Sequence, residues 1–83
     1  MIERFLRKNI TNLNHHLTMG FLESKDIFPT DDEAIIITNF LKENINLILN
    51  DSNYIYNLKG MIRDDIFNSI LLLYNEYKNK YLN

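Results

Sequence analysis

The sequence predicts an all-α protein, folded as a small antiparallel bundle of three to four helices in one domain, residues 1–83. Apolar residues recur at helical spacing along most of the chain. Only two glycines and one proline interrupt them, far fewer than the tight turns of an all-β fold require. There is no cysteine to form a disulfide, so the core must rest on the 46% of residues that are hydrophobic.

The first helix is expected over residues 2–22, where apolar side chains lie three and four positions apart on one side of a helical cylinder. This stripe consists of Ile2, Phe5, Leu6, Ile10, Leu13, Leu17 and Phe21. The opposite face carries Arg4, Arg7, Lys8, Thr11 and His15. Gly20 stands near the end of the pattern, where it fits a helix C-cap or a bend.

The second helix is expected over residues 31–50, and the stretch "PTDDE" marks its start. Thr30 followed three residues later by Glu33 is a capping-box pattern. Asp31, Asp32 and Glu33 fill the first turn, where carboxylates meet the positive end of the helix macrodipole. The acidic cluster is therefore interpreted as a helix start.

This second helix is apolar around most of its circumference, which is typical of a central helix packed on two sides. One broad face is formed by Ala34, Ile37, Leu41, Ile45, Ile48 and Leu49. A second face is formed by Ile36, Phe40 and Leu47. We expect Ile37, Leu41 and Ile48 of the broad face to meet the first helix. The last helix either covers the second face or leaves it exposed as a contact surface.

Residues 53–60 and 63–82 complete the predicted bundle, after the turn and N-cap chemistry of "NDSN". The apolar residues that follow keep one helical phase: Ile55, Leu58, Ile62, Ile66, Ile70, Leu73, Tyr77 and Tyr81. One continuous helix over 52–82 is an alternative. A break near Gly60 or at Asp64 is preferred, because a glycine inside a helix costs up to about 1 kcal/mol.

The residue inventory argues against an enzyme and against a bound cofactor or metal. The three serines are in no nucleophile-elbow motif, and two distant glycines cannot form a phosphate-binding loop. His15 and His16 are adjacent and point about 100° apart on a helix, so they cannot chelate one ion together. A metal or catalytic carboxylate site at residues 31–33 is the weakest hypothesis, because this run enters an apolar helix without a ligand loop.

Charge gives limited support to nucleic-acid binding. The alternative function is a nucleic-acid-binding regulator that uses Arg4, Arg7, Lys8 and His15 on the first helix. The net charge of −2 and the pI near 5.5 lack the electropositive footprint that such proteins need.

The preferred function is that of a small non-enzymatic protein acting through protein–protein contacts, as an adaptor, inhibitor or regulatory subunit, or as a homodimer. The residues expected to bind the partner are Ile36, Phe40, Leu47, Leu71 and Leu72. A cytoplasmic location without membrane contact is expected, because "MIERFLRKNI" lacks the apolar core of a signal peptide and no apolar run reaches 18 residues.

Overall fold

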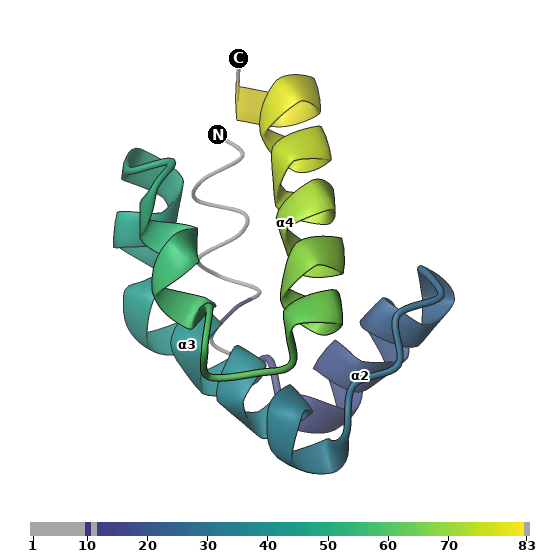
Figure 1. Cartoon of the computed structure of the whole chain (residues 1–83). Coiled ribbons are helices and arrows are strands. Elements are labelled where there is room, and N and C mark those ends of the chain that lie inside the picture. Colours follow the sequence, from purple (N-terminus) through teal and green to yellow (C-terminus); the bar gives the residue numbers. More distant parts are fainter. Residues whose placement is uncertain (1–9, 11, 83) are drawn as a thin grey trace.

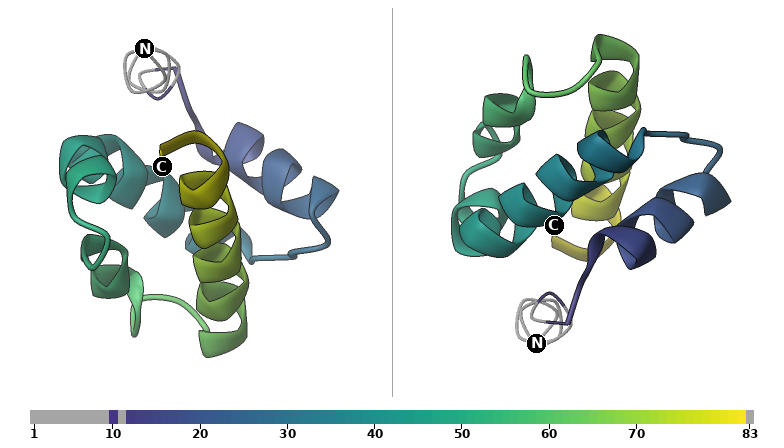
Figure 2. Two further views of the ribbon diagram at one scale, coloured as in Figure 1. Left: turned by 90° about the horizontal axis from the view of Figure 1, so that it is seen from above. Right: turned by 90° about the horizontal axis from the view of Figure 1, so that it is seen from below.

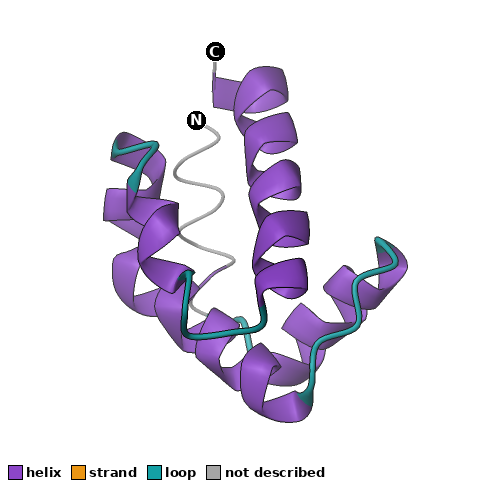
Figure 3. Ribbon diagram, in the orientation of Figure 1, coloured by secondary structure: helices purple, strands orange, loops and turns teal. Residues whose placement is uncertain are grey.

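The computed structural model describes residue 10 and residues 12–82, and these residues form helices and turns but no strand (Figure 3). The all-α prediction is confirmed. The elements are α2 (His15–Ser24), α3 (Asp31–Asn50), the 3₁₀ helix η1 (Tyr54–Leu58), α4 (Asp64–Tyr77) and the π-helical turn η2 (Lys78–Leu82).

The helices α3 and α4 form two walls of the molecule (Figure 1). The short helix η1 contacts α3, and the loop after η1 crosses to the start of α4. The helix α2 packs against the first half of α3, as the two turned views in Figure 2 show. The buried hydroxyls of Thr18 in α2 and Thr38 in α3 lie 2.6 Å apart and join these two helices.

The core is centred on η1 and the beginning of α4. Its largest fully buried side chains are Phe67, Ile55 and Leu58. Buried side chains of α3 complete it from the other wall: Ala34, Ile37, Phe40 and Ile48. The hydroxyl of Tyr74 in α4 donates a hydrogen bond of 2.6 Å to the carbonyl of Ile48, which ties the far ends of the two walls together.

The expectation of one helix over residues 2–22 is wrong, because the chain leaves helical geometry before His15. Asn14 has extended backbone angles (φ −129°, ψ 171°), and its side-chain oxygen accepts the Leu17 amide at 2.9 Å. Asparagine is among the best N-cap residues, so α2 starts anew here. Gly20 lies inside α2, which ends at Ser24. Residues 1–9 and 11 lie outside the described part of the chain.

The predicted bounds of the second helix are confirmed, and so is its capping box at Thr30 and Glu33. The sequence did not predict the kink at Asn44, where φ is −127° and ψ is 17°. The Asn44 side-chain amide donates to the Phe40 carbonyl at 3.0 Å, and its oxygen accepts the Tyr54 hydroxyl at 2.9 Å. The Asn44 side chain thereby provides a hydrogen-bond donor to the Phe40 carbonyl at the kink.

The preferred break in the third segment is confirmed, and the single helix over 52–82 is wrong. The expected helix at 53–60 is the shorter 3₁₀ turn η1. Gly60 has φ +90°, in the left-handed region that favours glycine, and this residue turns the chain toward α4.

The two glycines predict opposite effects of the same substitution. A Cβ atom added at either position finds open space within 4 Å, so the backbone conformation determines whether alanine stabilises or destabilises the fold. We expect Gly60→Ala to lower the free energy of unfolding by about 1 kcal/mol, because alanine is strained at positive φ. Gly20→Ala, inside α2, should raise it by about 0.5–1 kcal/mol. Urea unfolding followed by circular dichroism measures both, and shifts of the same sign would contradict this account.

Candidate functional site

The most buried charged group of the described chain is the carboxylate of Glu33, in the acidic run at the start of α3. Its side chain is 8% exposed and forms an ion pair with the half-exposed Arg63, whose Nη2 lies 3.0 Å from Oε1. The carboxylate also accepts the Thr30 amide at 2.9 Å and the Arg63 amide at 2.8 Å. Arg63 Nη2 reaches the carbonyl of Phe28 at 3.0 Å, so the loop before α3 is tied to the start of α4.

These contacts lower the pKa of Glu33 to about 2. The side-chain hydrogen bond from Arg63 is the largest cause, burial opposes it, and the amides of Thr30 and Arg63 contribute further. The pKa of Arg63 is raised by the same pair. Both carboxylate oxygens are engaged within the fold, so this group is suited to holding elements together rather than to proton transfer.

The remaining acidic residues of the run, Asp31 and Asp32, are exposed. Within residue 10 and residues 12–82, no group of three His, Cys, Asp or Glu side chains is placed to hold a metal ion.

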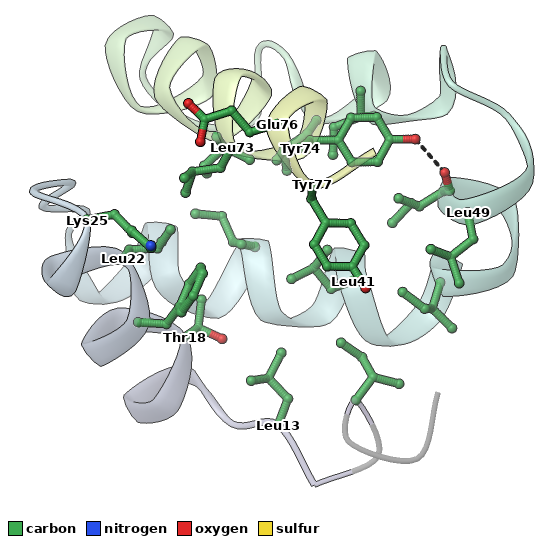
Figure 4. Close-up of a pocket in the computed structure, with 18 of the residues that line it drawn as sticks. Leu13, Thr18, Leu22, Lys25, Leu41, Leu49, Leu73, Tyr74, Glu76 and Tyr77 are labelled. Atoms are coloured by element: carbon green, nitrogen blue, oxygen red, sulfur yellow. Dashed lines mark hydrogen bonds between the residues drawn. The ribbon is translucent and has the colours of Figure 1, made fainter. Parts of the chain in front are cut away.

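An open cavity of about 630 Å³ lies between α2, α3 and α4. We call it the apolar groove, because most side chains that line it are aliphatic or aromatic. The α3 wall consists of Ile37, Leu41, Ile45, Ile48 and Leu49. The α4 wall consists of Ile70, Leu73, Tyr74, Glu76 and Tyr77, and the ring of Tyr77 projects into the groove (Figure 4).

The third side of the groove is built by α2 and the residues before it. Ile10, Leu13, Thr18, Phe21 and Leu22 line this side, and Ile55 and Leu58 of η1 close the floor. Phe21 is 57% exposed although it borders an apolar space. The charged side chains of Lys25, Glu76 and Lys80 also line the groove, and all three residues are exposed, so they lie at its opening.

The structure does not bring the predicted partner-binding residues together into this groove. Phe40 is buried, and its ring stacks on Tyr54 of η1 with centroids 5.9 Å apart. Ile36 and Leu71 are half-buried against the core. Leu47 and Leu72 are exposed, at 50% and 65%. A role for these five residues in partner binding stays a prediction.

The groove residues that sequence reasoning missed belong to the broad face of the second predicted helix. Leu41 was expected to meet the first helix, and Ile45 and Leu49 lie on the same face of α3. Their helical spacing was visible in the sequence, but the pattern does not show which of two apolar faces finds a neighbour. Of the face that the sequence left in doubt, Phe40 is covered by Tyr54 of η1, which also reaches Asn44, whereas Leu47 stays exposed.

Of the residues proposed for nucleic-acid binding, Arg4, Arg7 and Lys8 lie outside the described residues. His15 is half-buried and borders a smaller cavity of about 210 Å³ beside Asn14. Its ring lies 4.1 Å from the ring of His16, measured between centroids.

Comparison of the chain with protein-family models, with curated proteins and with solved structures finds no match. No helix in the described ranges, residue 10 and residues 12–82, combines the length and the apolar character needed to cross a membrane.

Proposed function

We propose that the protein is a non-enzymatic binding module that accommodates an amphipathic helix of a protein partner in the apolar groove. The observation that carries this proposal is the groove itself, an open space of about 630 Å³ walled by three helices. Binding sites are commonly concave and mostly apolar, with a few polar groups at defined places. An amphipathic helix laid in a hydrophobic groove is a recurring mode of protein recognition.

The spacing of the walls supports a helix as the occupant. Leu41, Ile45 and Leu49 form a row on α3 at intervals of four residues. Leu73 and Tyr77 form a second row on α4 with the same interval. Rows of this kind accept side chains that recur every three or four residues on a facing helix. The charged groups at the opening fit an occupant whose outer face is polar.

The reactive side chains of the protein support a role in protein binding rather than in catalysis. The chain has no cysteine. Among the described residues, the carboxylate of Glu33 has a strongly lowered pKa, and it is held by Arg63 and the capping box. Buried charged groups engaged in this way serve fold geometry more readily than acid–base chemistry.

The test compares two exposed apolar residues, only one of which borders the groove. Phe21→Glu places a charge in the groove wall, and Leu72→Glu makes a comparable change on the outer face of α4. The probe is a synthetic helical peptide with leucines at positions i, i+3, i+4 and i+7, added to isotope-labelled protein up to millimolar concentration. We expect Phe21→Glu to weaken binding about tenfold or more, and Leu72→Glu to change it less than twofold.

The methyl signals of Leu41 and Ile45 report where the peptide binds. A loss of binding in Leu72→Glu with normal binding in Phe21→Glu would overturn the groove as the contact surface. It would favour the exposed leucines predicted from the sequence. No binding to the protein or to either variant would contradict the proposal altogether.

A further inference from the structure

We propose that the apolar groove binds α2 of a second copy of this chain, so that two molecules form a two-fold symmetric dimer. This inference rests on the proposed function of the groove as a helix receptor, and it names the partner. The sequence allowed a homodimer, but this contact uses none of the five partner-binding residues that the sequence predicted.

The helix α2 has two apolar sides, and this is the first argument. Leu22 faces the fold and is buried. Leu17 and Phe21 lie one turn apart on another side, where they are 56% and 57% exposed. Lys25, directly after the end of α2, is the next position of the same row. We call these three residues the outer strip. Adjacent exposed apolar side chains mark a contact surface more often than isolated ones do.

The spacing of the outer strip matches the groove. Leu17, Phe21 and Lys25 stand four positions apart, and they span about 12 Å at 1.5 Å per residue. On the α3 wall of the groove, the row from Leu41 to Leu49 has the same interval and about the same length. Rows with an interval of four on two facing helices interdigitate in the commonest mode of helix packing. The strip is therefore a suitable occupant of the groove.

The outer strip and the groove lie on one face of the molecule, as a closed dimer requires. Phe21 belongs to both, because it borders the groove and projects from α2. A two-fold axis beside Phe21 therefore brings α2 of each copy onto the groove of the other in a single contact. Strip and groove on opposite faces would instead add copies into an open chain. The two-fold contact makes each interaction twice, so a short helix can supply a sufficient contact area.

The charges at the groove opening favour a second copy over a partner whose charges have one sign. Lys25 and Glu76 are exposed at this opening, on the α2 side and the α4 side, and Lys80 lines it as well. Nζ of Lys25 lies 6.0 Å from the centre of the Phe21 ring, so this charge accompanies the apolar part of the strip. When α2 of one copy lies between the walls of the other, Lys25 of each faces Glu76 of the other. Pairs at the rim of a contact contribute more to the choice of partner than to affinity.

The experiment compares two exposed leucines, only one of which belongs to the outer strip. Sedimentation equilibrium of the full chain gives the dissociation constant of the dimer. We expect Leu17→Glu to raise this constant about tenfold or more, and Leu72→Glu, on the outer face of α4, to change it less than twofold. Leu17 lies outside the lining of the groove. Leu17→Glu should therefore still bind the synthetic helical peptide, at least as tightly as the unchanged chain does, because the competing copy is gone.

A charge exchange tests the pairing between copies, and it applies even if Leu17→Glu fails to fold. Lys25→Glu alone and Glu76→Lys alone each place like charges opposite one another twice per dimer. At low ionic strength, each should weaken association about tenfold. An equimolar mixture of the two variants should associate within about threefold of the unchanged chain, because every pair in the mixed dimer again has opposite signs. A mixture that associates no better than its components would contradict the two-fold arrangement.

The outcomes separate this inference from the proposed function. A monomer at millimolar concentration that binds the peptide would overturn the dimer, and the groove would remain a receptor for a different protein. A dimer weakened by Leu72→Glu and not by Leu17→Glu would also overturn it. A monomer that binds no peptide would contradict both proposals. A dimer weakened by Leu17→Glu, with no peptide binding by any variant, supports the contact between copies and contradicts a receptor for other helices.

Discussion

Replacing Glu33 by alanine is expected to lower the free energy of unfolding by about 2–4 kcal/mol, because one carboxylate serves several partners. The substitution removes the capping box of α3 and the ion pair with Arg63. It also leaves the Arg63 amide without its carboxylate acceptor. For a chain of 83 residues, total stability is about 4–12 kcal/mol, so this loss is a large share of it.

Two further variants divide the Glu33 effect into its parts. Glu33→Gln keeps an oxygen for the capping box but removes the charge that faces Arg63, so its cost should lie below that of alanine. Asp32→Asn removes the same charge from an exposed neighbour in the same turn, and it should cost only about 0.3–1 kcal/mol. Denaturant unfolding measures all three. An equal cost for Asp32→Asn and Glu33→Ala would contradict the account.

Acid titration checks the same prediction through the lowered pKa of Glu33. The unfolded chain binds this proton near pH 4.5 and the folded chain near pH 2, so the ion pair stabilises the fold fully above pH 4.5. This contribution is lost as pH falls from 4.5 toward 2. Because Arg63 is half-exposed and solvent screens the pair, we expect a loss of about 1–2 kcal/mol. Glu33→Gln should lack this part of the acid dependence.

Phe67→Ala is expected to lower the free energy of unfolding by about 3–5 kcal/mol, enough to unfold a large fraction of the protein. Phe67 is 2% exposed, and its ring lies 5.9 Å from that of Tyr56, so the substitution leaves a cavity between η1 and α4. Phe28→Ala is the matched control, because the same atoms are removed from a side chain that is 62% exposed. Calorimetry or denaturant unfolding should show a change of about 0.5 kcal/mol or less for the control. Comparable losses at both positions would contradict the placement of the core.

The sequence predicted α3 well because its signals are local. The capping box at Thr30 and Glu33 depends on residues three positions apart, and the apolar rows repeat within one helix. The break before α4 was likewise readable from Gly60, whose positive φ few other residues adopt.

The start of α2 was mispredicted because two local signals disagree there. The apolar stripe continues in phase across the break, whereas Asn14 offers an N-cap that competes with helix continuation. Periodicity alone does not show where along the stripe a helix begins.

The site was less predictable than the fold, since it depends on contacts between distant residues. Glu33 and Arg63 are 30 positions apart, and nothing near either residue indicates the other. The apolar groove needs three helices in their final arrangement, so the sequence could identify its walls as apolar faces but not as an open space.

The contact between Glu33 and Arg63 has a consequence for which amino-acid substitutions the chain tolerates. The same carboxylate starts one helix and receives the backbone amide that precedes another. A substitution at position 33 therefore removes the carboxylate partner of the guanidinium at position 63, and a substitution at position 63 removes the side-chain partner of the carboxylate. Their effects on stability are non-additive, as for other residues in direct contact. The effect of a substitution at either position therefore depends on the residue at the other. Asp31 and Asp32, which lie between Thr30 and Glu33, are exposed, so substitutions there are expected to act independently of position 63.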